Sequence, residues 1–197
     1  KSTNAISKLV DNNKLHHMTI VLPTWNEELL ILSKLEDILI QDYPKNLLEI
    51  IVIDAGSSDS TLEIVNNWKN NYDFSNGLKF KIIEEGKRLG KSVSINRAFF
   101  EAHESSEILM MSDIDCRLSP RTLKSISNNF LDQSIGAVTA RQILLNQDFS
   151  ALTKYESNYR DFYTKIRIAE SKLDSTPIFH GECSAYRRIS IKGYKIV

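Results

Sequence analysis

The chain has 197 residues, enough for one globular domain with a buried core, and its 42% hydrophobic content excludes a disordered chain. Its 25 basic and 25 acidic side chains leave no formal net charge at pH 7, which argues against a bulk electrostatic grip on nucleic acid. No apolar run approaches the roughly 18 residues that indicate a membrane span, and the sequence has no signal-peptide pattern.

Short apolar runs alternate with helix-like patterns along most of the chain. After a polar arm at residues 1–17, buried strands are predicted at 18–22, 48–55, 78–85, 107–113 and 135–143. Apolar residues at three- and four-residue steps predict a helix at 29–41, and further helices are predicted at 62–68, 90–104, 121–131 and 149–173. This succession predicts an α/β fold, a Rossmann-like α/β/α sandwich with a largely parallel central sheet.

Local signals mark where three of these helices should begin. Two pairs have the spacing of a capping box, namely Thr24 with Glu27 and Ser60 with Glu63. Ser119 and Pro120 suit the N-cap and the first position of the helix at 121–131. Polar loops therefore follow several strands at the edge where parallel sheets bind their ligands.

Two acids end the fourth predicted strand, in the stretch "LMMSDIDCRLSP" at 109–120. Asp113 and Asp115 alternate, so both side chains can point to the same side. Carboxylates this close repel each other, and Mg²⁺ or Mn²⁺ is usually held by one or two acids together with substrate phosphates. A divalent-cation site is one interpretation, and a pair of surface acids that cap the next helix is the alternative.

The loop after the second strand has features of an anion site. In "IDAGSSDST" (53–61), Asp54 is expected to face the crevice, and the following helix offers free N–H groups to an anion. An ordinary strand-to-helix turn with serine caps explains the same residues, and this motif alone favours that explanation.

The loop after the third strand is basic and punctuated by glycine. In "EGKRLGKSVSINRA" (85–98), Gly86 and Gly90 bracket a loop whose cations are Lys87, Arg88 and Lys91. Such a loop can cradle a diphosphate, although its glycine spacing is not that of a P-loop. A solvated surface loop is the alternative.

The stretch "HGECSAYRR" at 180–188 has no clear secondary-structure pattern. His180, Glu182 and Cys183 could ligate zinc, but three mixed ligands without a second cluster make a weak zinc pattern. A loop that closes over a substrate is a second interpretation. A packed segment with Tyr186 inside is the interpretation that base rates favour.

Five motifs at these separations resemble the family 2 glycosyltransferases with the GT-A fold. They are "TIVLPTWNEE", "IIVIDAGSSDST", "GKRLGKSVSINRA", "LMMSDIDCRLSP" and "HGECSAYRR". The resemblance covers about residues 18–194. It implies a GT-A domain at 18–197, with a nucleotide-binding part at about 18–118 and the start of an acceptor-side part at about 119–197.

The resemblance implies an inverting enzyme of the hexosyltransferase type. It would move a sugar from a nucleotide-diphosphate sugar, with a UDP-sugar favoured, to a hydroxyl of a glycan, lipid or protein acceptor. By position, the residues that would contact the nucleotide sugar are Pro23, Thr24 and Glu27 around the nucleoside, Asp54 beside the base, and Arg88, Lys91 and Asp113. Asp113 and Asp115 match the DxD motif, whose Mg²⁺ or Mn²⁺ would stabilise charge on the leaving diphosphate.

Two positions depart from the family pattern. Many relatives carry a second acid that reads the pyrimidine edge, and Ala55 stands there in this chain, which weakens the choice of uracil as the donor base. The family's general base follows a segment that is Gly193-Tyr194 here, so we expect it beyond Val197, with Glu182 as a weak substitute. We therefore expect a catalytic domain truncated before its general base.

Two other functions stay open at this point. A sugar-phosphate nucleotidyltransferase usually has a glycine-rich loop after the first strand, where this chain has "PTWNEE". A nucleotide-sugar-binding module without catalysis is the second alternative. Cys116 and Cys183 are the only cysteines, which fits a reducing, cytoplasmic location. We expect the cytoplasmic face of a membrane if missing regions of a longer protein provide an anchor.

Overall fold

The computed structural model describes residues 15–141, 162–170, 173 and 181–191. In chain order its elements are β1 (Met18–Thr24), α1 (Ile31–Leu39), η1 (Lys45–Leu47), β2 (Leu48–Asp54), α2 (Thr61–Asn71), η2 (Phe74–Asn76), β3 (Lys79–Glu84), α3 (Lys91–Phe100), β4 (Ile108–Ser112), α4 (Thr122–Asn129), β5 (Ala137–Thr139), β6 (Cys183–Arg187) and η3 (Arg188–Ile191). The predicted strands and helices are therefore present over the described residues, mostly with shorter bounds.

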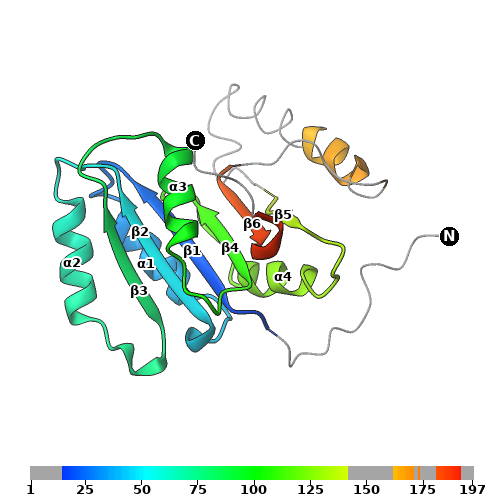
Figure 1. Cartoon of the computed structure of the whole chain (residues 1–197), viewed down its shortest axis with the longest axis horizontal. Coiled ribbons are helices and arrows are strands. Elements are labelled where there is room, and N and C mark those ends of the chain that lie inside the picture. The colour runs from blue at the N-terminus through cyan, green and yellow to red at the C-terminus, as the bar shows by residue number, and fades with distance from the viewer. Residues whose placement is uncertain (1–14, 142–161, 171–172, 174–180, 192–197) are drawn as a thin grey trace, which may run out of the picture. The chain divides into compact units, whose positions relative to one another are not determined.

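One sheet contains the six strands in the order β3-β2-β1-β4-β6-β5 (Figure 1). The pairs β3–β2, β2–β1 and β1–β4 are parallel, whereas β6 runs antiparallel to β4. In the parallel register Thr24 lies opposite Asp54, and Asp54 lies opposite Glu84. The carboxyl ends of these three strands therefore lie at one edge of the sheet, which is where ligands of such sheets bind.

The sheet is covered on both faces, because α3 lies on one side and α1 on the other (Figure 1). The cluster on the α3 side consists of Val21, Ile51, Ile53, Ile83, Ala98, Ala102 and Leu109. The strand residues of opposite parity are buried as well, together with Ile31, Leu35 and Ile38 of α1. Strands buried on both faces read as continuous apolar runs, which is why the sequence predicted them well.

The predicted start of α2 is confirmed in position, because Ser60 is its N-cap, whereas the predicted start of α1 is wrong and the cap contacts of both helices differ. Leu30, an apolar residue that cannot cap, precedes α1, while the Thr24 hydroxyl donates to the Ile53 carbonyl at 3.1 Å. Within the described part of the chain, the Ser60 side chain makes no cap bond at α2, and Asp59 accepts from the Thr61 amide instead, at 3.0 Å. The Thr24 hydroxyl and the Asp59 carboxylate therefore make contacts that the capping-box pattern does not include.

The last predicted elements differ more. Helix α4 begins at Thr122 rather than directly after Ser119, and the strand predicted at 135–143 is present as the short β5. The helix predicted at 149–173 falls mostly outside the described residues, of which 162–170 are helical.

The chain divides into two compact units, one of residues 1–138 with 181–197 and the other of residues 139–180. The nucleotide-binding and acceptor-side parts expected from the resemblance stay a prediction. Among the residues that the structure describes, no helix has both the length and the hydropathy needed to cross a bilayer.

Tyr43 ties the start of β1 to the neighbouring helices. Its buried hydroxyl donates to the His16 carbonyl at 2.6 Å, and the His16 amide donates to the Ser127 hydroxyl of α4 at 3.1 Å. Burial raises the pKa of Tyr43 to about 12, against its ordinary value of 10.0. Tyr43 therefore keeps its proton to a higher pH in the folded chain than in the unfolded chain.

We predict that Tyr43→Phe lowers the free energy of unfolding by about 1 kcal/mol at pH 8, because one buried hydrogen bond is lost. The stability that the protonated Tyr43 hydroxyl contributes is fully present below its pKa in the unfolded chain, near 10. It is lost as the pH rises through its pKa in the folded chain, near 12. The difference in unfolding free energy between native chain and variant should therefore narrow in urea titrations as the pH rises from about 10 to about 12. A gap that stays constant over this range contradicts the assignment.

Candidate functional site

The loops that follow β1 and β2 are joined to each other at the carboxyl edge of the sheet. Asn26, with a positive φ of 57°, accepts from the Ser58 amide through its side chain at 2.9 Å. Its own amide donates to the Ser57 hydroxyl at 2.9 Å, and the Glu27 amide donates to the Thr61 hydroxyl at 2.8 Å. Because the bonds run in both directions between the loops, this edge is organised before any ligand binds.

Pro23 and Thr24 lie at the end of β1. Pro23 lies opposite Ile53 of β2. The pairing of β1 with β4 ends at Val21, two residues earlier, so the missing N–H of Pro23 breaks no bond to β4. Thr24 is buried and bonded to β2. Its side chain therefore holds the strand end and does not face open solvent.

Asp54 holds the turn after β2. One carboxylate oxygen accepts from the amides of Gly56 and Ser57, each at 2.9 Å, and the other accepts from the Ser57 hydroxyl at 2.5 Å. The residue is 1% exposed. The expectation that Asp54 faces the crevice is therefore corrected, because its carboxylate is occupied by its own turn.

The basic loop after β3 lies against that turn. A Cβ added at Gly56, which has a φ of 81°, would come within 3.1 Å of the backbone of both Gly86 and Lys87. Only glycine permits this approach without strain. The close packing of the two loops brings the cations of residues 87–91 to the same edge as the acids.

Arg88 lies over the ring of Trp25, with 4.2 Å between the guanidinium carbon and the ring centroid. This is a cation–π contact between the loop after β3 and the loop after β1. The Trp25 side chain is 44% exposed, which is unusual for a large aromatic residue. Sequence reasoning missed Trp25, although a lone aromatic residue in a polar loop at a strand end is a signal that could have found it.

Asp113 and Asp115 follow β4 directly. The Asp113 amide donates to the Glu182 carbonyl at 2.9 Å, which fixes its backbone to the chain before β6. Its carboxylate pairs with Lys91 Nζ at 2.5 Å, so the first residue of α3 reaches the acids. Asp115 is exposed. The alternative in which both acids cap the next helix is wrong, because Arg121 is the N-cap of α4.

Glu27 is near enough to these acids to sense their charge. Partial burial raises the pKa of Glu27 above its usual range, and the neighbouring Asp115, Asp59 and Asp113 raise it further. The residues predicted around the nucleoside and around the metal are thus electrostatically coupled. The edge carries more negative charge than Lys91 alone neutralises.

The donor chemistry of this edge fits a hard divalent cation bound together with phosphates. Among the described residues, no group of three or more His, Cys, Asp or Glu side chains is placed to hold an ion alone. A pair of carboxylates is nonetheless what Mg²⁺ or Mn²⁺ commonly takes from a protein when substrate phosphates supply other ligands. Asp113 and Asp115 are the residues present for that task.

The stretch at 180–188 is mainly structural where it is described. Residues 183–187 form β6, so the interpretation of these residues as a loop that closes over a substrate is wrong. Tyr186 packs on Phe99 at 6.2 Å between ring centroids, as expected for a packed segment. Arg188 donates to the Ala102 carbonyl at 3.1 Å, near the end of α3. His180 lies outside the described residues.

Several curated proteins resemble this chain. It is 31% identical over 152 residues to the probable glycosyltransferase YdaM of Bacillus subtilis, covering 76% of this chain and 35% of YdaM. It is 26% identical over 184 residues to the poly-beta-1,6-N-acetyl-D-glucosamine synthase of Staphylococcus epidermidis, covering 92% of this chain and 42% of that protein. The chain thus spans well under half the length of these curated relatives.

Solved structures support the fold. The mannosyltransferase PcManGT from Pyrobaculum calidifontis, in complex with GDP-Man and Mn²⁺, gives a TM-score of 0.75 at 34% identity over 91% of this chain and 46% of its own. S. aureus TarS 1-349, in complex with UDP-GlcNAc, gives 0.55 at 27% identity over 66% of this chain and 35% of its own. The predicted GT-A type of α/β fold is confirmed by these likenesses and by the mostly parallel sheet.

The family-level prediction is confirmed as well. The model of the glycosyl transferase family 2 matches residues 19–194, which run from the second residue of β1 past β6 and include every loop at the candidate site. With that match over most of its length, this chain belongs to glycosyl transferase family 2.

Proposed function

We propose that this chain is the donor-binding and sugar-transferring part of a metal-assisted, inverting glycosyltransferase that uses a nucleotide-diphosphate sugar. The observation that carries the proposal is the meeting of Asp113, Asp115, Lys91 and Glu27 at the carboxyl edge of the sheet in a member of family 2. Two acids and a lysine at a ligand-binding edge suit a diphosphate and its cation.

The loops after β1 and β2 are proposed to hold the nucleoside. Pro23 and Thr24 end β1, and Glu27 begins the next loop, while Asp54 acts through the turn that it organises. Trp25 adds an exposed aromatic face on which a base can stack once Arg88 moves aside. Arg88 would then be free to approach the phosphates as a cation.

Asp113 and Asp115 are proposed to hold the divalent cation, which when bound supplies Lewis-acid stabilisation of the diphosphate leaving group. The Asp113 carboxylate is held in place by its ion pair with Lys91 Nζ at 2.5 Å. When an anionic donor occupies the edge, the Lys91 ammonium has a phosphate as a second partner. Lys91 is therefore proposed to serve both the carboxylate and the donor.

The donor is proposed to be a UDP-sugar, with a GDP-sugar as the alternative. The structural neighbours include both chemistries, since TarS is in complex with UDP-GlcNAc and PcManGT with GDP-Man and Mn²⁺. Ala55 leaves this chain without the second acid expected to read a pyrimidine. The nucleotide base is therefore the first property to measure.

We predict that the native chain binds one of UDP and GDP more tightly with Mn²⁺ than without it in calorimetry. Asp113→Ala with Asp115→Ala should weaken this metal-dependent binding at least tenfold (~1.4 kcal/mol), because the carboxylates that hold the cation are lost. Glu36→Ala with Glu63→Ala is the matched control, since it removes two exposed carboxylates from α1 and α2.

The control should bind within about twofold of the native chain, a change of only ~0.4 kcal/mol. If the folded native chain binds neither nucleotide, or if the double variant at positions 113 and 115 binds as the native chain does, the donor-site proposal is wrong. UDP-GlcNAc and GDP-Man in the same titration identify whether the sugar adds affinity.

We also predict a pH-dependent stability change for Glu27→Gln in the metal-free chain. Because the pKa of Glu27 is raised, the folded chain binds its proton more tightly than the unfolded chain does, so this stabilisation is lost as the pH rises through the folded pKa. The variant should therefore exceed the native chain in stability at pH 7.5, by less than about 1 kcal/mol because solvent still screens this partly buried group. It should lose the advantage as the pH falls toward the ordinary carboxyl pKa of 4.5.

Urea titrations at both pH values measure this difference, and Glu63→Gln, which removes an exposed carboxylate from α2, controls for charge removal. An advantage of Glu27→Gln that is the same at both pH values, or that the control reproduces, contradicts the coupling between Glu27 and the other acids.

A further inference from the structure

Lys34 is a fully buried lysine on α1, with a side chain that is 0% exposed. A buried ammonium loses its hydration, and burial lowers the pKa of Lys34 below its usual range, while Cys116 and Asp37 nearby offset part of that effect. A helix that packs against a sheet would gain more from an apolar residue at this position. The burial of a lysine at this position must therefore be explained by the contacts of its ammonium group.

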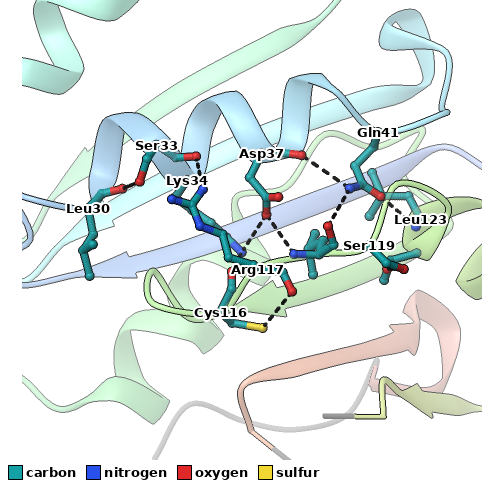
Figure 2. A network of polar contacts seen from close by, with 11 residues as sticks. Leu30, Ser33, Lys34, Asp37, Gln41, Cys116, Arg117, Ser119 and Leu123 are labelled. Carbon is teal, nitrogen blue, oxygen red and sulfur yellow. Dashed lines mark hydrogen bonds and ion pairs between the residues drawn. The ribbon is translucent and has the colours of Figure 1, made fainter. Parts of the chain in front are cut away.

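Its contacts lead to the segment that follows Asp113 and Asp115 (Figure 2). Lys34 Nζ donates to the Cys116 carbonyl at 2.5 Å and lies 3.7 Å from the Asp37 carboxylate. The same Asp37 oxygen accepts from the Leu118 amide at 3.0 Å. One buried ion pair thus binds a carbonyl and an amide of residues 116–118.

Two further bonds attach this segment to α1 and to Gln41, which follows α1. Arg117 Nη1 donates to the Ser33 carbonyl at 2.6 Å, and Gln41 Nε2 lies 3.4 Å from the Leu118 carbonyl. Figure 2 shows the side chains of Lys34 and Asp37 reaching the segment from one face of α1. Consecutive residues 116, 117 and 118 are all held, so the segment has little freedom to shift along α1.

The segment is bonded directly to the turn that carries the two acids. Asp115 is the residue directly before Cys116, and the Cys116 amide donates to the Asp113 carbonyl at 3.3 Å. On its other side Asp113 is bonded through its amide to the Glu182 carbonyl. The short turn that bears both carboxylates is therefore clamped between β6 and α1.

We propose that Lys34 and Asp37 are positioning residues that fix Asp113 and Asp115 for the cation and diphosphate, with Arg117 as an outer support. The proposal rests on the proposed function. A buried ion pair rarely adds stability over apolar residues of similar size, and it costs desolvation. What apolar residues cannot do is bind the Cys116 carbonyl and the Leu118 amide, so the pair secures geometry at the metal ligands.

The test uses Lys34→Met with Asp37→Asn. This double variant leaves no unpaired buried charge, and the Asn side chain can still accept from the Leu118 amide, so it isolates the loss of the lysine. The expected result is a roughly tenfold rise in the Mn²⁺ concentration that half-saturates nucleotide binding, since partners of metal ligands commonly matter by ~10- to 100-fold. Nucleotide binding without metal should be unchanged.

Lys45→Met is the matched control, because Lys45 also donates to backbone carbonyls, those of Gln41 and Tyr43, but lies away from the acids. It should leave the Mn²⁺ requirement as in the native chain. Circular dichroism and thermal unfolding verify the fold of each variant. If the Lys34 and Asp37 variant folds and requires no more Mn²⁺ than the native chain, the inference is overturned.

Arg117→Ala provides a second route where the core variant fails to fold, because Arg117 is exposed. It should raise the Mn²⁺ requirement in the same direction, by about threefold (~0.65 kcal/mol), and an unchanged requirement overturns the inference. A failure of the proposed function looks different, since the native chain would then show no metal-dependent nucleotide binding, or Asp113→Ala with Asp115→Ala would bind as the native chain does.

Discussion

The parallel register of β1, β2 and β3 is the constraint on which the candidate site depends. Thr24, Asp54 and Glu84 lie opposite one another, so the loops that follow them begin side by side. The bonds between Asn26 and the turn at Ser57 and Ser58 are possible only with this register. A shift of one residue would move every strand side chain to the other face and separate the loops.

The loops that meet at this edge carry several carboxylates, and part of the repulsion between them is offset by other contacts. Lys91 neutralises Asp113, and the turn amides satisfy Asp54. Glu27 keeps a raised pKa because of its burial and its acidic neighbours. In the proposed function, the repulsion between neighbouring carboxylates would favour a divalent cation at this edge, so the acids that repel each other in the free chain would provide affinity for the ion.

The strands and the family could be predicted from the sequence because both depend on local patterns. Apolar runs indicate buried parallel strands, and motifs at strand ends indicate the family. Sequence reasoning misplaced the start of α1 because Thr24 bonds across to β2 and not within a capping box. At α2 the predicted N-cap Ser60 is in place, but Asp59 accepts the bond from the Thr61 amide. Strand β6 was missed because it is short, mixed in composition and pairs with β4 from far along the chain. Lys34 escaped notice because a lysine in an amphipathic helix is normally taken for a surface residue.

Two lysines serve the turn at Asp113 from opposite sides, and their surroundings separate their roles. Lys91 is about half exposed, with a side chain that solvent and a donor phosphate can reach, so its charge can be shared with a ligand. Lys34 is enclosed and holds a backbone carbonyl that no ligand competes for. A solvent-exposed charge such as that of Lys91 suits reversible binding of a ligand, whereas a buried charge such as that of Lys34 suits a backbone geometry that is fixed before the ligand binds. The desolvation of Lys34 is therefore the free-energy cost of holding the turn at residues 113–116 rigid. This is consistent with Lys34 bonding the Cys116 carbonyl and not a carboxylate of Asp113 or Asp115.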